Sequence, residues 1–217
     1  MLIDFEYLGI DVSKVSGAIH VGAHWGEERY GYAEHDLDVL WFEPNPEVFK
    51  KLQENIVEFP KQKAFQLLVI NEDDKEYTFH IAKNGDAGAS ASSSLLKDSG
   101  LTNAYPSVTY VKDILITGLT LDTFFKRYTI DKSRYQFLSI DTEGSELLVL
   151  KGMVEILPHI QFAEIEVVTG MNCWYNGSTV EEIDAFMISC GFKKKGMCFQ
   201  CGSEVGNGKV YNALYQR

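Results

Sequence analysis

Basic residues are scarce in this chain. Its 217 residues include 20 Lys and Arg against 31 Asp and Glu, which gives a formal net charge of −11. Proteins that bind nucleic acids usually present a basic face. The basic run at residues 193–195 is short, and we expect it to be a solvated loop. The charge balance therefore predicts that nucleic acid is not a partner of this protein.

Long apolar runs are missing as well. No segment approaches the roughly 20 apolar residues that a bilayer-spanning helix needs, and the first residues lack the pattern of a signal peptide. We therefore expect a cytoplasmic protein with no membrane partner. Because 45% of the 217 residues are apolar, we expect one packed domain over residues 1–217, with residues 1–17 as an N-terminal extension packed on it.

Cysteines are few, at positions 173, 190, 198 and 201. Cys198 and Cys201 have the CxxC spacing of a zinc ligand pair, but structural zinc sites need a closed set of four ligands. Cys190 occupies the apolar face of an expected helix, where it is poorly placed to complete such a set. In a reducing compartment we therefore expect thiols, with neither disulfides nor a zinc site.

Strand-like and helix-like segments alternate along most of the chain. The expected strands are residues 18–21, 38–42, 65–70, 76–82, 135–140, 160–168 and 210–215. The expected helices begin after Gly26, after Asn45, after Thr120, at residue 145 (ending at 157) and after a capping box of Ser178 and Glu181. This alternation predicts an α/β domain with a mostly parallel sheet and helices on both faces.

Two connections bear on where a ligand could bind. The acidic turn at residues 72–75 is expected to make residues 76–82 a hairpin partner of residues 65–70. Residues 84–94 are rich in Gly, Ala and Ser, and are too small and polar to form core. They are expected to form either a plain surface loop or a lid over a binding site.

The segment IHVGAHWGEE at residues 19–28 runs from an apolar strand through a glycine turn into an expected helix. Glu43 ends the next strand, 21 residues after Gly22. This interval is about what a βαβ unit needs to place a carboxylate beside a bound ribose. The arrangement predicts a nucleoside site. The alternative is a tight strand–helix turn that binds nothing.

Glu27 and Glu28 narrow the choice of nucleoside. The N-terminus of a helix attracts the pyrophosphate of a dinucleotide, but two carboxylates at that place would repel it. S-adenosylmethionine has no phosphate and carries a sulfonium cation, so the same acids would not disfavour it. The sequence therefore favours S-adenosylmethionine over NAD.

Carboxylates also follow the later strands. Asp141 and Glu143 come directly after residues 135–140, and Glu166 lies in the next expected strand. Because ligands of open α/β sheets bind beyond the carboxyl ends of the strands, we expect these acids at the same rim as the nucleoside site. Buried carboxylates are costly alone, so they would hold a cation, share a proton or accept backbone N–H groups. The alternative for Asp141 is simple capping of the following helix.

Four segments carry a family resemblance: HVGAHWGEE (20–28), WFEPNPEVFKKLQENI (41–56), FLSIDTEGSELLVLKG (137–152) and YNALYQR (211–217). Together they resemble the cofactor loop, the second strand and helix, the strand–acid–helix block and the closing strand of the FkbM-type methyltransferase family. The resemblance spans residues 18–217. It implies a class I Rossmann-like fold with an antiparallel C-terminal strand, and methyl transfer from S-adenosylmethionine, commonly to a hydroxyl oxygen.

The resemblance also implies roles for individual residues. Glu43 would hold the ribose hydroxyls of the cofactor, and the members of the glycine loop would border its methionine moiety. The full set of expected cofactor-binding residues is Gly22, His24, Gly26, Glu43, Asn45 and Asp141. The family often has an acid where this chain has His20, an Asn where it has His24 and a Lys where it has Ser139. The first two differences bear on cofactor affinity, and the third removes a positive charge from the substrate side.

We therefore expect an enzyme that methylates an oxygen nucleophile of a small-molecule acceptor, a sugar-containing or other polyhydroxylated compound. The expected catalytic residues are Asp141 and Glu143, with Asp141 as the general base. This interpretation needs no metal. In the alternative role, Asp141, Glu143 and Glu166 would bind Mg²⁺, which would lower the pKa of the acceptor hydroxyl.

Two other classes of protein stay open at this point. An NAD-dependent oxidoreductase acting on nucleotide sugars is disfavoured by Glu27 and Glu28, and by the lack of a Tyr-x-x-x-Lys pair in a helix. A non-catalytic binding module on the same fold is disfavoured by the intact Glu43 and Asp141. The sequence leaves the oligomeric state and the identity of the acceptor open.

Overall fold

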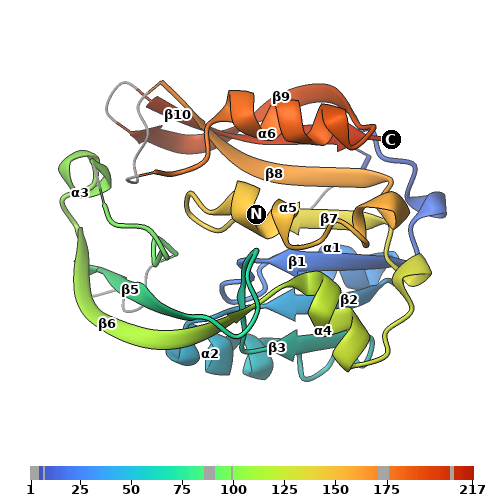
Figure 1. The fold of residues 1–217 in the computed structure, drawn as a ribbon, viewed down its shortest axis with the longest axis horizontal. Coiled ribbons are helices and arrows are strands. Elements are labelled where there is room, and N and C mark those ends of the chain that lie inside the picture. Colours follow the sequence, from blue (N-terminus) through green and yellow to red (C-terminus); the bar gives the residue numbers. More distant parts are fainter. Residues whose placement is uncertain (1–4, 7, 86–90, 99, 171–175, 206–207) are drawn as a thin grey trace.

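A seven-stranded sheet forms the centre of the computed structural model, which describes residues 5–6, 8–85, 91–98, 100–170, 176–205 and 208–217 (Figure 1). The strand order is β3-β2-β1-β7-β8-β10-β9. The strands are β1 (Gly17–Val21), β2 (Asp38–Phe42), β3 (Gln62–Phe65), β7 (Phe137–Ile140), β8 (Phe162–Thr169), β9 (Lys193–Val205) and β10 (Gly208–Gln216). Neighbours from β3 to β8 are parallel, and β10 is antiparallel to both β8 and β9. This confirms the mostly parallel sheet and the antiparallel C-terminal strand.

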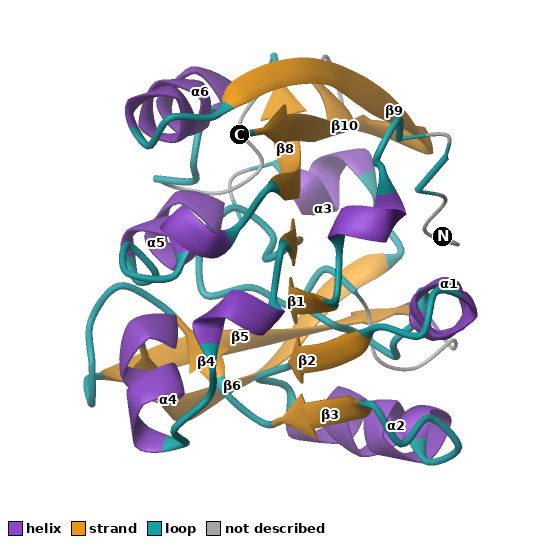
Figure 2. Cartoon of the chain, turned by 90° about the vertical axis from the view of Figure 1, so that its right-hand side faces the viewer, coloured by secondary structure: helices purple, strands orange, loops and turns teal. Residues whose placement is uncertain are grey.

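Helices cover both faces of this sheet (Figure 2). On one face lie α4 (Leu121–Arg127), α5 (Glu146–Lys151) and α6 (Val180–Ser189), and on the other lie α1 (Arg29–Glu34) and α2 (Pro46–Ile56). Successive side chains of a strand point to opposite faces, so Ile19 of β1 joins the core under α4 to α6 while Ala18 joins the core under α1 and α2. All five residues of β1 are buried, as expected for a strand covered on both sides.

The described part of the N-terminal segment packs on the α1 and α2 side. The ring of Phe5 is buried and meets the ring of Phe137 edge-on at 5.1 Å between centroids. It also lies 6.2 Å from the ring of Tyr32 in α1. A 3-10 turn at Val12–Lys14 then leads into β1. None of the helices in the described ranges combines the length and the apolarity needed to cross a bilayer.

A second, three-stranded sheet was not foreseen. Its order is β4-β6-β5, with β4 (Leu68–Val69), β5 (Glu76–Asn84) and β6 (Val108–Leu119). The expected strand at 65–70 is wrong as one element, because its start belongs to β3 and its end to β4. The expected hairpin partner is also wrong, since β5 pairs antiparallel with the distant β6. A short helix, α3 (Leu101–Ala104), lies in the connection between β5 and β6.

Helix ends follow local chemistry, with two corrections. Asn45 accepts a hydrogen bond from the backbone N–H of Glu47, and Thr120 caps α4, as predicted. The helix expected at 145–157 ends instead at Lys151, and a 3-10 turn at Leu157–His159 follows. The predicted box of Ser178 and Glu181 is displaced by one residue, because α6 is capped by Thr179 and Glu182.

Two further expectations concern segments of irregular sequence. Residues 193–195, expected as a solvated loop, begin strand β9 and extend the sheet beyond β10. Of the expected loop at 84–94, residues 86–90 lie outside the described part. Its described end is ordered against β5, since Ser94 and His80 form an antiparallel bridge.

Candidate functional site

The ends of β1 and β7 meet at Gly22 and Asp141. The backbone N–H of Asp141 donates to the carbonyl oxygen of Val21 at 2.9 Å, which extends the parallel pairing of the two strands. Gly22 has φ +83°, and a Cβ at this position would lie 1.6 Å from the carbonyl oxygen of Asp141. Only glycine allows this approach, so the first glycine of the loop brings the two candidate segments together.

A pocket lies at this junction, with roughly 630 Å³ of space between its walls when the adjoining open solvent is included. Its walls come from the ends of β1, β2 and β7, from the start of α2, from the β3–β4 connection and from β5. The lining includes Gly22, His24, Glu43, Asn45, Asp141 and Glu143. The structure therefore brings together most of the residues that the sequence singled out.

Glu43 is the best-defined polar group of the pocket. It is 7% exposed, and its Oε2 accepts a hydrogen bond from the backbone N–H of His24 at 3.0 Å. Its Oε1 accepts a second one from the backbone N–H of Asn45 at 2.8 Å. Burial raises the pKa of Glu43 to about 7, although these two N–H groups act in the opposite direction. Each carboxylate oxygen keeps a further lone pair for a hydroxyl donor.

Two polar side-chain atoms of the lining residues lack a partner among the described residues. They are Nδ2 of Asn45, a residue that is 1% exposed, and Nε2 of His24. His24 has φ +44°, and its other ring nitrogen is hydrogen-bonded to Glu27 at 2.7 Å. Buried polar atoms without partners are rare in native structures. Their place beside Glu43 fits a ligand that offers several hydrogen-bonding groups.

Gly26 and the acidic start of α1 do not line the pocket. Gly26 has φ +69° and does not line the pocket, and a Cβ there would lie 2.7 Å from Cδ1 of Leu52 in α2. Its contribution is therefore to let the loop pack closely on α2. Glu28 occupies the N-cap position of α1, and burial raises its pKa to about 7.

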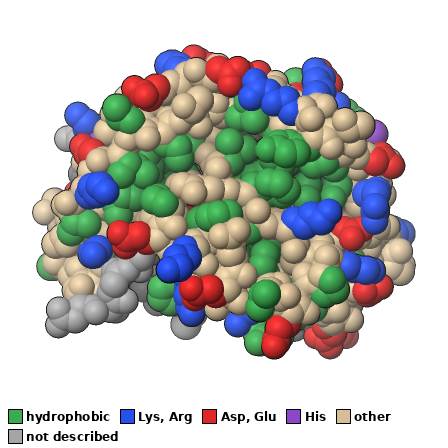
Figure 3. Space-filling view, turned by 90° about the horizontal axis from the view of Figure 1, so that it is seen from below, with side chains coloured by type: hydrophobic (Ala, Val, Ile, Leu, Met, Phe, Trp, Pro, Cys, Tyr) green, Lys and Arg blue, Asp and Glu red, His purple; other side chains and the backbone are tan. Residues whose placement is uncertain are grey.

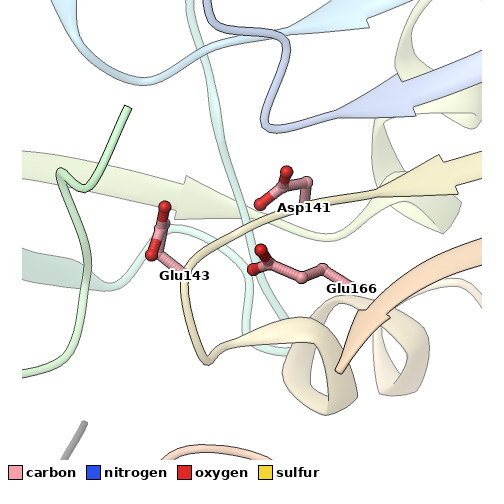
Figure 4. Close-up of side chains that lie close together, drawn as sticks. All are labelled: Asp141, Glu143 and Glu166. Carbon is pink, nitrogen blue, oxygen red and sulfur yellow. The ribbon is translucent and has the colours of Figure 1, made fainter. Parts of the chain in front are cut away.

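Asp141, Glu143 and Glu166 point toward one another (Figure 4). One carboxylate oxygen of each lies within 4.8 Å of the others. Burial raises the pKa of all three, and the charge of Asp141 raises those of Glu143 and Glu166 further. Glu166 shares a hydrogen bond with Asp141. Such a cluster can share protons or hold a cation.

Asp141 does not act as the simple helix cap considered above. The N-cap residue of α5 is Ser145, and the loop amides of Thr142 and Gly144 donate to Glu146. The nearby Glu164 of β8 accepts a hydrogen bond from Asn212 at 2.7 Å. These contacts leave the carboxylate of Asp141 facing Glu166 and the pocket.

A family model described as the methyltransferase FkbM domain matches residues 20–194. This chain belongs to the FkbM methyltransferase family. The match covers the glycine loop, β2, the acidic loop after β7 and β8. It confirms the family expected from the sequence.

Solved structures support the fold of this FkbM domain. The METTL16 methyltransferase domain has 10% identity and a TM-score of 0.55, with 98% of this chain and 64% of that chain covered. Aeropyrum pernix fibrillarin, crystallised with natively bound S-adenosylmethionine, has 8% identity and a TM-score of 0.51, with 96% and 69% covered. At these identities the likeness shows the class I methyltransferase fold and no more. The comparison with curated proteins gave no match.

Three residues depart from the FkbM pattern, and only one of them lines the pocket. His20 is buried, its Nδ1 lies 2.9 Å from the hydroxyl oxygen of Tyr32, and burial lowers its pKa to about 3. Ser139 is buried as well, and neither residue lines the pocket. His24 does line it. Of the three differences, only His24 is therefore in a position to contact a ligand directly.

Sequence reasoning missed several parts of the FkbM site. Phe79 of β5 lines the pocket. Ala91 and Ser93 line it as well, and they belong to the segment 84–94 that was expected as either a surface loop or a lid. No local signal places β5 there, since its partner β6 is distant in sequence. The buried Glu146 was missed too, although it lies three residues after Glu143 in the quoted motif.

Proposed function

We propose that this chain transfers a methyl group from S-adenosylmethionine to a hydroxyl of a small, polyhydroxylated acceptor, such as a sugar-containing compound. The observation that carries the proposal is the carboxylate of Glu43. It lies at the end of β2, held by two backbone N–H groups, and lines the same pocket as Asp141 and Glu143. Family membership and fold support methyl transfer.

The residues present fit S-adenosylmethionine. Glu43 can accept hydrogen bonds from both ribose hydroxyls, because both of its oxygens have a free lone pair. The unpartnered Nδ2 of Asn45 offers a donor beside it. Gly22 and His24 would border the methionine moiety. The acids Glu27 and Glu28 lie where a dinucleotide would need to place its pyrophosphate, which disfavours NAD.

Besides a cofactor site, methyl transfer to a hydroxyl requires a base that accepts the hydroxyl proton. The cluster of Asp141, Glu143 and Glu166 would supply this base. Bound S-adenosylmethionine supplies an electrophilic methyl group. Asp141, which lines the same pocket as Glu43, would accept the proton of the acceptor hydroxyl when the methyl group is transferred from the sulfonium sulfur to the oxygen. A raised pKa brings a carboxylate closer to the working pH, where a general base is most effective. Glu143 and Glu166 would then share the accepted proton with Asp141.

The charge of the pocket restricts the acceptor. Among the described residues, its lining contains Glu43, Asp141 and Glu143 but no Lys or Arg. A phosphate or carboxylate on the acceptor would find no Lys or Arg side chain in this lining to pair with, so a neutral polyol fits better. On the face drawn in Figure 3, Lys and Arg are interspersed with Asp and Glu. The proposal therefore favours a small neutral molecule over a nucleic acid as the acceptor.

Mg²⁺ is the alternative for the same three acids. Asp141, Glu143 and Glu166 offer oxygen ligands of the kind that Mg²⁺ prefers. In that case the metal would lower the pKa of the hydroxyl, and activity would depend on it. Chelation of the purified protein with EDTA, followed by Mg²⁺ addition, distinguishes the two roles. The direct-base mechanism predicts unchanged turnover.

Turnover on defined acceptors tests the proposal. The protein is incubated with S-adenosylmethionine and a panel of neutral glycosides and polyols, each paired with its phosphorylated form, and S-adenosylhomocysteine release is measured. We expect release with at least one neutral member, and a lower rate with its phosphorylated form. The NAD-dependent alternative predicts NAD binding instead. A non-catalytic module predicts S-adenosylhomocysteine binding without turnover on any acceptor.

A further inference from the structure

The loop from Asp141 to Gly144 has an unusual backbone. Glu143 has φ +56° and Gly144 has φ +102°. A left-handed conformation is uncommon for a residue with a side chain, and it persists where surrounding contacts enforce it. This conformation sets the direction of the Glu143 side chain relative to Asp141. The contacts that hold the loop therefore decide whether the two carboxylates stay together.

Glu146 provides most of these contacts through a single atom. Its Oε1 accepts hydrogen bonds from the backbone N–H of Thr142 at 3.1 Å, from the hydroxyl of Thr142 at 3.1 Å and from the backbone N–H of Gly144 at 2.9 Å. The residue is 3% exposed. These bonds reach the residues before and after Glu143, so Glu146 fixes the conformation of the loop between them.

Ser94 holds the same loop from the second sheet. Its hydroxyl donates to the carbonyl oxygen of Glu143 at 2.8 Å. The backbone of Ser94 is itself fixed, since it exchanges two hydrogen bonds with His80 of β5, at 2.8 and 3.1 Å. Ser93 next to it lines the pocket. Ser94 thus connects β5 and the pocket-lining Ser93 with the loop from Asp141 to Gly144.

We propose that Glu146 is a positioning residue for Asp141 and Glu143, with Ser94 as its second support. The role of Glu146 is to accept hydrogen bonds from the loop, and it touches neither the cofactor nor the acceptor. This inference rests on the proposed function in one respect, namely that the two positioned carboxylates serve methyl transfer. The positioning itself can be measured without an acceptor.

Substitution by Gln and by Ala separates geometry from charge. Gln keeps one carbonyl oxygen that can accept all three bonds, while Ala removes the acceptor. Asp122 provides a matched control, because it is a buried carboxylate that accepts from the backbone N–H of Glu155 at 3.0 and 3.1 Å and does not line the pocket. Asp122→Ala should lower the melting temperature without affecting the loop.

Hydrogen exchange of the Thr142 and Gly144 amides is the acceptor-free measurement. In Glu146→Ala their exchange should speed up by at least about tenfold, and in Glu146→Gln by less than about threefold. Ser94→Ala should speed exchange at Gly144 to a smaller extent. Affinity for S-adenosylhomocysteine should stay within about twofold in every variant, since Glu43 holds the ribose.

Turnover gives the functional counterpart, measured with the best acceptor of the panel described above. We expect kcat to fall about tenfold to a hundredfold in Glu146→Ala, to recover in Glu146→Gln and to be unchanged in Asp122→Ala. Unchanged exchange in the Ala variant, or equal damage by Gln and Ala, would overturn the positioning role. An absence of turnover in the parent protein, with the exchange pattern as expected, would instead contradict the proposed function.

Discussion

Glu43→Gln should make the ligand-free protein more stable at alkaline pH while it weakens cofactor binding. The substitution keeps the shape of the side chain and removes its charge. Burial raises the pKa of Glu43 from 4.5 to about 7, so the folded state disfavours the ionised form. An acid whose pKa is raised in the folded state contributes stability that is fully present below its unfolded-state pKa, which is 4.5 for Glu43. This stability is lost as the pH rises through the folded-state pKa of about 7.

The size of the effect follows from that pKa difference. Above both values, ionised Glu43 costs the fold about 3 kcal/mol. Gln offers one oxygen for the backbone N–H groups of His24 and Asn45, so one of these hydrogen bonds is lost, at about 1 kcal/mol. The net gain is about 2 kcal/mol at pH 8.5, or about 4–8 °C in melting temperature for a chain of this size. Near pH 5.5 the two effects nearly cancel.

Thermal unfolding at both pH values, combined with calorimetric titration of S-adenosylhomocysteine, checks this prediction. Gln presents a donor to one ribose hydroxyl, so affinity should fall at least about tenfold. Glu54→Gln, on the exposed side of α2, is the matched control and should change neither quantity. A lower melting temperature at pH 8.5 would refute the assigned cost of burial, and unchanged affinity would refute the role of Glu43 at the ribose.

Three further predictions concern residues in or near the pocket and the stability of the protein. Asp141→Asn should reduce turnover by about two orders of magnitude or more with little change in cofactor affinity; full activity in the acceptor assay would remove Asp141 from the mechanism. Gly22→Ala should prevent folding or cost more than about 3 kcal/mol, because its Cβ would lie 1.6 Å from a backbone oxygen, whereas Gly196→Ala has open space; circular dichroism melts compare the two. The free energy of unfolding of the parent should rise as the pH falls from about 8 to about 5.5, because burial raises the pKa values of Glu43 and Glu146 to about 7. Urea titrations in which the free energy of unfolding decreases over this fall in pH would contradict the prediction.

Local sequence patterns predicted the centre of the sheet and much of the pocket. The glycine loop, Glu43 and Asp141 each follow a strand directly, and the rule that ligands bind at the carboxyl ends of strands brought them together. The second sheet could not be foreseen in this way. Its strands β5 and β6 pair across residues 85–107, and neither strand's pattern specifies so distant a partner.

Side-chain roles within the site were harder to predict than its location. Gly26 belongs to the same loop as Gly22, but it faces Leu52 rather than the pocket. Glu146 was expected only as part of a helix, and its hydrogen bonds to Thr142 and Gly144 arise from the left-handed turn at Glu143. Such turns depend on tertiary contacts, which a single sequence does not display.

Calorimetric titration of the parent protein with S-adenosylhomocysteine and with NAD tests the central claim most directly. The claim is that the pocket at Gly22, Glu43 and Asp141 binds S-adenosylmethionine. The account predicts one molecule of S-adenosylhomocysteine bound per chain, binding weakened at least about tenfold by Glu43→Ala, and no heat of binding with NAD. Binding of NAD, or no binding of S-adenosylhomocysteine to the folded parent, would contradict it.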